Sequence, residues 1–190
     1  KCDCVMADNF KGAYDGVSAL IHRGHKKIGI ITGPEYIYTA FERFEGYKKA
    51  MQEHGLPLEK GYIENGEFKK EEGKNAFLKL MKMKDRPTAV FVTNYFMTIG
   101  VIEAILKEGY KIPEDISILA FDSLQVSTTI DWSAIIKPNL STIRQPMAEI
   151  GIRAAELLIQ RIEKPEETYI PQVIRLPTQI TLTESVVEIL

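Results

Sequence analysis

Short apolar runs alternate with amphipathic segments along this chain, and no other feature of the sequence constrains its fold as strongly. The runs cover residues 28–31, 89–93 and 116–121 and are mostly apolar without strict alternation. Such runs are typical of parallel strands that are buried on both faces. The segments 39–54, 96–108 and 145–164 instead carry apolar residues at spacings of three and four, which indicates helices. Strands that alternate with helices predict right-handed βαβ units around a parallel sheet.

Both ends of the chain are predicted to be extended. Residues 178–186 alternate apolar and polar side chains, which predicts an edge strand. The apolar stretch 4–7 is typical of the end of a strand. Since no element precedes it for pairing, we expect the chain to be part of a longer protein.

The composition excludes several classes of protein. Lys and Arg total 24 against 26 Asp and Glu, a net charge of -2, whereas a nucleic-acid grip needs clustered positive charge. No apolar run approaches the roughly 18 residues that span a bilayer. The two cysteines, Cys2 and Cys4, are too few and too close for a disulfide framework.

The sequence offers little for catalysis or metal binding. It lacks a Gly-x-Ser-x-Gly elbow, a phosphate-binding loop and a Gly-x-Gly-x-x-Gly turn after a strand. His22 and His25 are three residues apart but have no carboxylate or cysteine at ligand spacing. We therefore expect neither an enzyme nor a metal or cofactor, and an enzyme is the weakest reading for want of a nucleophile–base pair.

A binding site is the better interpretation. Ligands bind open α/β sheets outside the carboxyl ends of the strands. Phe68, Asn94 and Asp122 are predicted to lie there. Arg43 is predicted to lie in the first turns of the helix that follows the strand 28–31. A sugar-like ring needs acceptors, an Arg fork for its hydroxyls and an aromatic face. Each residue also has a plain structural explanation: Asp122 as a turn residue, Arg43 in a surface ion pair, Phe68 in the core. Their convergence on one edge favours binding.

Eight ordered segments resemble the lactose-repressor/galactose-repressor (LacI/GalR) family of bacterial transcription regulators. They include the Glu-Arg-x-x-Gly-Tyr pattern at 42–47 and the Ile-Pro-Glu-Asp-Ile-Ser pattern at 112–117. The segments are residues 7–13, 24–33, 42–47, 87–94, 112–122, 140–146, 176–178 and 184–185. Any one is weak evidence, but the ordered set over nearly the whole chain is specific.

The resemblance implies an α/β fold of the type I periplasmic-binding-protein kind, with parallel sheets flanked by helices in two lobes, of which the N-terminal lobe is incomplete. It implies a remnant of that lobe at 1–25 and a C-terminal lobe at 26–138. A helix at 139–166 would return to the N-terminal lobe, and 167–190 would be a tail of the C-terminal lobe. A DNA-binding helix-turn-helix would precede this chain.

The resemblance also implies ligand contacts at six positions, which are Arg43, Phe68, Asn94, Asp122, Gln145 and Lys11. Arg43 would be the effector-contacting arginine, and Phe68 the aromatic residue against the ligand ring. Asn94 and Asp122 would follow their strands as amide and carboxylate. Gln145 and Lys11 would reach the ligand from the other lobe.

Two departures from the family pattern concern this edge. Tyr95 stands where the family usually has Asp, which changes the hydrogen bonding or dimer contacts there. The segment 122–142 is about half a dozen residues longer than the family spacing, an insertion that loops tolerate well. We expect it to cap the cleft or contact a partner.

The function implied is that of an effector-binding and dimerisation domain of a cytoplasmic LacI-type regulator. A small sugar-like effector would close the lobes and control operator binding by the headpiece of a homodimer, with no membrane involved. The alternative is an exported sugar-binding protein of a transporter, in the periplasm or at the cell surface. The Gly-His pair at 24–25 and the motif at 112–117 favour the regulator.

Overall fold

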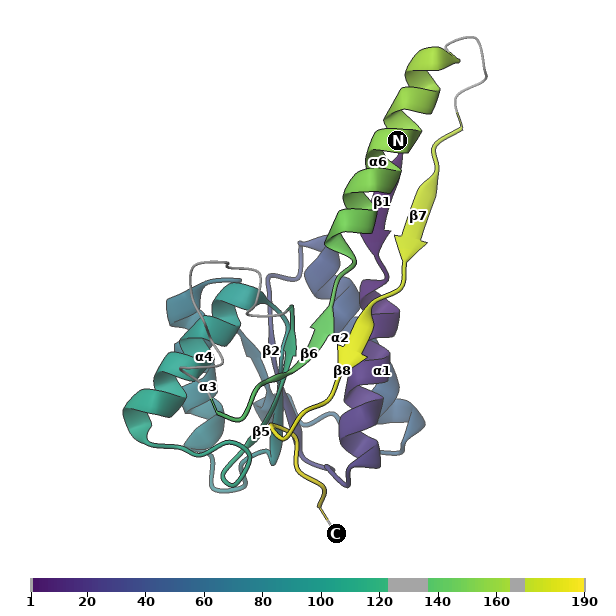
Figure 1. Ribbon diagram of the computed structural model, residues 1–190. Helices are drawn as coiled ribbons and strands as arrows, with labels where there is room; N and C mark the ends of the chain where they lie inside the picture. Colours follow the sequence, from purple (N-terminus) through teal and green to yellow (C-terminus); the bar gives the residue numbers. More distant parts are fainter. Residues whose placement is uncertain (1, 123–136, 165–169, 190) are drawn as a thin grey trace.

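The computed structural model describes residues 2–122, 137–164 and 170–189, and its centre is a six-stranded sheet (Figure 1). The strand order is β3-β2-β4-β5-β6-β8, parallel throughout except for β6 against β8. The bounds are β2 Ile28–Thr32, β3 Ile63–Asn65, β4 Ala89–Val92, β5 Ser117–Phe121, β6 Ser141–Arg144 and β8 Gln179–Thr181. Every residue of β2, β4 and β5 is buried, which confirms the strands predicted from the apolar runs.

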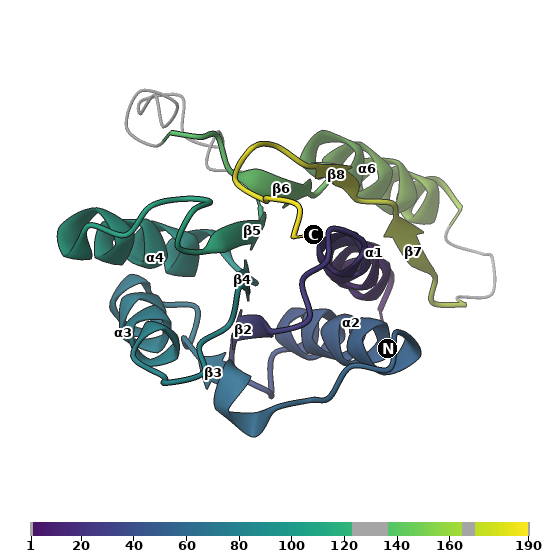
Figure 2. The same ribbon diagram turned by 90° about the horizontal axis from the view of Figure 1, so that it is seen from below.

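Two helices cover each face of this sheet (Figure 2). Helices α1 (Asn9–His22) and α2 (Tyr38–Glu53) lie on one face, and α3 (Lys70–Met81) and α4 (Tyr95–Glu108) on the other. A short 3-10 turn, η1 (Lys60–Tyr62), leads into β3. We refer to this sheet and its four helices as the body.

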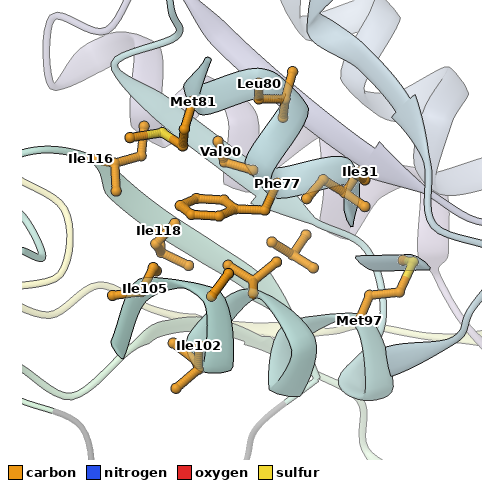
Figure 3. Close-up of a cluster of buried hydrophobic side chains, with 14 of the residues drawn as sticks. Ile31, Phe77, Leu80, Met81, Val90, Met97, Ile102, Ile105, Ile116 and Ile118 are labelled. Atoms are coloured by element: carbon orange, nitrogen blue, oxygen red, sulfur yellow. The ribbon is translucent and has the colours of Figure 1, made fainter. Parts of the chain in front are cut away.

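Each face of the body has its own apolar core. Between the sheet and α3–α4, the Phe77 ring lies among Met81, Val90 and Ile118 (Figure 3). The other core packs α1 and α2 against the sheet around Phe121 and other residues of β2, β4 and β5. Burial of these side chains on both faces explains why the central strands are apolar at successive positions.

A separate arm projects from the body (Figure 1). It consists of β1 (Cys4–Ala7), β7 (Val173–Leu176) and helix α6 (Met147–Glu163), and β1 pairs with β7 in parallel as a two-stranded sheet. Arg161 of α6 holds Asp3 through two hydrogen bonds of 3.0 and 3.2 Å. Leu157 is the buried residue of α6, whereas Ile159 and Ile162 are more than half exposed.

The division into lobes stays a prediction, and the elements in the first and last of its ranges lie in different parts of the structure. Residues 1–25 do not belong together: β1 lies in the arm, but α1 packs beside α2 on the body, with Ala13, Val17 and Leu20 in its core. The range 167–190 also divides, because β7 pairs with β1 and only β8 joins the large sheet as its edge strand. The apolar face of α1 is buried against the large sheet. The alternation of strands and helices alone does not predict this placement.

No described helix is both long and apolar enough to cross a membrane. Residues 123–136 of the long segment 122–142 lie outside the described residues, so its expected role as a cap or partner contact stays a prediction.

Candidate functional site

Arg43 is the centre of a polar cluster at the carboxyl ends of the central strands. It comes from the second turn of α2, and only 4% of its surface is exposed. Its Nε donates to Asn9 Oδ1 at 2.9 Å, and its Nη1 donates to the Thr93 carbonyl at 2.6 Å. The guanidinium carbon lies 3.8 Å from the centre of the Phe121 ring. The ion pair on a solvated face is therefore wrong for Arg43.

The charge of Arg43 is held in a desolvated setting. Burial lowers the pKa of Arg43 to about 10, while the nearby carboxylates of Asp122 and Glu42 act in the opposite direction. The guanidinium thus stays protonated at neutral pH. Its Nη2 makes no hydrogen bond within the described part of the chain. A planar fork with a spare donor suits recognition of a hydroxyl or carboxylate.

Asp122 follows β5 and faces the same cluster. Its Oδ2 lies 3.9 Å from Arg43 Nη1, and its Oδ1 accepts a hydrogen bond of 2.6 Å from Gln145 Nε2. Its φ of 79° lies in the left-handed region, and its amide donates to the Ile143 carbonyl. Asp122 is thus a turn residue and a member of the cluster at once. A left-handed residue that is not glycine is strained, a feature that concentrates at functional sites.

Asn94 and Phe68 lie at the same edge but make structural contacts of their own. Asn94 caps α4, its Oδ1 accepting from the Phe96 amide at 2.9 Å. The half-buried Phe68 packs against the core below α3 and α4, so core packing accounts for part of its surface. Its ring lies so close to Gly33 that a Cβ there would be 2.2 Å from a ring carbon. Gly33 therefore fixes where this aromatic ring can lie.

Within the described residues, the Lys11 side chain has no hydrogen bond or ion pair to this cluster. Its ammonium forms an ion pair of 2.7 Å with Asp15, one turn further along α1, and its side chain is 65% exposed. Gln145, which like Lys11 is expected to reach the ligand from the other lobe, donates a hydrogen bond to Asp122. The ligand contacts of all six predicted residues remain predictions.

Sequence reasoning missed Asn9. This residue is fully buried at the start of α1, accepts from Arg43, and donates from Nδ2 to the Ala7 carbonyl at 3.0 Å. The segment 7–13 carries part of the family resemblance, but Lys11 is the residue in it that is predicted to contact the ligand. The available signal was that Asn9 is a polar residue between the end of a strand and the buried face of a helix.

Among residues 2–122, 137–164 and 170–189, no group of three or more His, Cys, Asp or Glu is placed to hold an ion. The cluster is built instead for hydrogen bonding, with a guanidinium, a carboxylate and an amide.

The model of the periplasmic binding protein-like domain matches residues 17–186. The chain is 38% identical over 185 residues to the HTH-type transcriptional repressor PurR of Pasteurella multocida, covering 97% of this chain and 53% of that protein. It is 38% identical over 167 residues to the ribose operon repressor of Haemophilus influenzae, covering 88% of this chain and 48% of that protein.

The chain belongs to the LacI/GalR family. The structure of a LacI family regulator from Enterococcus faecium with bound ribose matches with a TM-score of 0.84 and 30% identity, covering 98% of this chain and 66% of that one. The complex of the regulator CelR with cellobiose matches with a TM-score of 0.84 and 27% identity, covering 97% of this chain and 54% of that one. The fold is thus that of the effector-binding domain of this LacI/GalR family, and the chain spans about half the length of the curated relatives it matches.

Proposed function

We propose that this chain binds a small polar effector, most simply a sugar, at the cluster around Arg43. The observation that carries the proposal is the convergence of Arg43, Asp122 and Gln145 at the carboxyl ends of parallel strands. This is where open α/β sheets bind their ligands. The printed titles of two structural relatives name bound ribose and cellobiose, which supports a sugar.

Each group has a role that its chemistry permits. The spare donor of Arg43 and the carboxylate of Asp122 would bind neighbouring hydroxyls, and the Phe68 ring would lie against the C–H face of the sugar. Two or three charge-assisted hydrogen bonds contribute roughly 1.5–3 kcal/mol each. After ordering costs, such a site gives an affinity between about micromolar and millimolar.

In the full protein, we propose that the effector closes two lobes. The arm would belong to the N-terminal lobe, whose remaining residues would cover the exposed apolar side chains of α6. An effector shifts the lobes only by binding one arrangement more tightly than another. In a cytoplasmic homodimer, closure would change the spacing of two helix-turn-helix headpieces, which must match the operator half-sites.

The regulator is favoured over an exported transport protein because the relatives named above are transcriptional repressors. No observation on the described residues favours transport.

The experiment is a thermal-shift screen of the full-length protein against ribose, cellobiose, other sugars and nucleobases, followed by calorimetry of the compounds that bind. A compound selective for the folded state raises the melting temperature. Asp122→Asn removes the negative charge, and asparagine tolerates the left-handed backbone at this position. Because one charge-assisted hydrogen bond is lost, we expect binding to weaken at least about tenfold.

The matched control is Asp85→Asn, which removes an exposed carboxylate paired with Lys27 away from the cluster. It should leave the affinity unchanged. Equal affinity of Asp122→Asn and the unsubstituted protein for every compound that binds would refute the proposed site.

A further inference from the structure

Three segments connect the arm to the body, and a polar side chain of the body holds a residue in or beside each one. Residues 7–9 join β1 to α1, 144–147 join β6 to α6, and 176–179 join β7 to β8. Arg43 holds Asn9 in the first segment, and Asp122 holds Gln145 in the second. Next to the third, Arg175 is held by Glu42. The third contact lies outside the proposed ligand site.

The contact between Glu42 and Arg175 is short and shared. Arg175 Nη2 lies 2.7 Å from Glu42 Oε1, and it also donates to the Tyr38 hydroxyl at 2.8 Å. Tyr38 and Glu42 are four residues apart, so they lie on the same face of α2. Hydrogen bonding to Glu42, and then to Tyr38, raises the pKa of Arg175. Arg175 lies on β7 opposite Met6 of β1, so the contact reaches the sheet of the arm.

This contact differs from a surface ion pair at its Glu42 end, which is buried, whereas the Arg175 side chain is 35% exposed. The Glu42 side chain is only 9% exposed, and its Oε2 has no hydrogen-bond partner among the described residues. If β7 moved away, the largely buried Glu42 carboxylate would lose the cation and the hydrogen bond that Arg175 supplies, which is unfavourable. By contrast, Lys49 and Glu53 on the same helix are both about half exposed, and such pairs contribute little.

Glu42 and Arg43 are neighbours on one rigid helix but point in different directions. Successive residues of an α-helix are turned by about 100° around its axis. Arg43 therefore reaches the carboxyl ends of the central strands, while Glu42 reaches β7. A displacement of α2 at the ligand site moves both contacts together.

We propose that Glu42 is a positioning residue, and that its ion pair with Arg175 sets the orientation of the arm relative to the body. Its relevance to effector binding rests on the proposed function, but the orientation itself does not. We call this ion pair the latch. While it is formed, the connecting segments that carry Asn9 and Gln145 stay beside Arg43 and Asp122.

The test is a distance distribution measured by double electron–electron resonance on the full-length protein without any ligand. Spin labels at Lys107 of α4 and Gln160 of α6, both exposed, report the body and the arm. Native cysteines, including Cys2 and Cys4, are first replaced by serine. Because no effector is added, a failed ligand screen and a failed latch are separate results.

We expect one narrow distribution in the parent protein. Glu42→Gln and Arg175→Met should each raise the population of other distances by about tenfold, the effect of losing a hydrogen bond to a charged group. The double variant should show no further change than either single variant, because both remove the same contact. Circular dichroism should be unchanged, since only the orientation moves.

Lys49→Gln is the matched control, since it breaks an exposed ion pair on the same helix, and its distribution should equal that of the parent. Arg175 lies on an exposed strand position, so Arg175→Met tests the latch even where Glu42→Gln does not fold. A distribution in Arg175→Met as narrow as in the parent, at the same mean distance, overturns the proposal.

Discussion

The substitution Arg43→Lys keeps the positive charge of this side chain but changes its hydrogen-bonding geometry. The guanidinium reaches two acceptors that lie in different directions, Asn9 Oδ1 through Nε and the Thr93 carbonyl through Nη1. A lysine ammonium is a single point of donation and cannot match this fork. We expect lysine to keep one of the two hydrogen bonds and lose the other.

The expected cost follows from burial. Asn9 and Thr93 are both fully buried, so the acceptor that loses its donor cannot turn to water. A buried acceptor without a partner, or a lost bond to a charged donor, costs about 1–3 kcal/mol. The free energy of unfolding should therefore fall by about 2 kcal/mol, in the middle of that range.

Urea unfolding of the full-length protein measures this change, with the slope against urea unchanged if only stability is affected. The control is Arg153→Lys on α6, whose side chain is half exposed and pairs with Glu156. It should change stability by less than about 0.5 kcal/mol. Asn9→Ala should also cost less in the Arg43→Lys protein than alone, because the two residues share a contact. A loss for Arg43→Lys as small as the control's would refute the reasoning.

Three further predictions concern His25 and Ser185, at the amino ends of the central strands, and Gly33, beside the site. Burial lowers the pKa of His25, so the folded protein resists its protonation; stability should be full above about pH 6.5 and fall as the pH drops below it. In thermal melts between about pH 7 and 5, His25→Gln should flatten this dependence, and an equally steep dependence would contradict it. Gly33→Ala places a Cβ 2.2 Å from the Phe68 ring and should weaken binding of any compound from the screen in calorimetry, whereas Gly151→Ala, with open space around it, should not. Ser185→Ala leaves two buried backbone groups of the sheet without a partner and should cost about 1–3 kcal/mol in urea unfolding; no loss would mean that those groups find other partners.

Three central strands and the helices α2, α4 and α6 could be predicted from the sequence because they depend on local patterns, whereas α1 and α3 are not among the predicted segments. The runs at 28–31, 89–93 and 116–121 correspond to β2, β4 and β5, since burial on both faces requires apolar residues throughout. The helix ends fall within about two residues of the predicted ones, within the usual spread of helix boundaries. Of the alternating tail 178–186, the residues Gln179–Thr181 form the edge strand β8.

Long-range placement could not be predicted in the same way. The pairing of β1 with β7 joins residues at opposite ends of the chain, and neither segment carries a signal for the other. The amphipathic pattern of α1 predicts that one face is buried but not what covers that face. Only the structure shows that α1 lies on the body.

At the candidate site, the sequence predicted which residues lie at the strand ends. It did not predict the hydrogen-bond partners of these residues. The proximity of Arg43 to Asp122 follows from strand ends meeting at one edge of a parallel sheet. The hydrogen bond from Arg43 to Asn9 depends instead on the buried start of α1. The ion pair of Lys11 with Asp15 is an ordinary helical pair, which the segment's family resemblance did not indicate.

The most direct measurement of the central claim is a crystal structure of the full-length protein with a compound from the thermal-shift screen. The account predicts polar atoms of that compound within hydrogen-bond distance of the Arg43 guanidinium and the Asp122 carboxylate. A compound bound elsewhere, with Arg43 still bonded only to Asn9 and Thr93 and with Asp122 untouched, would contradict it.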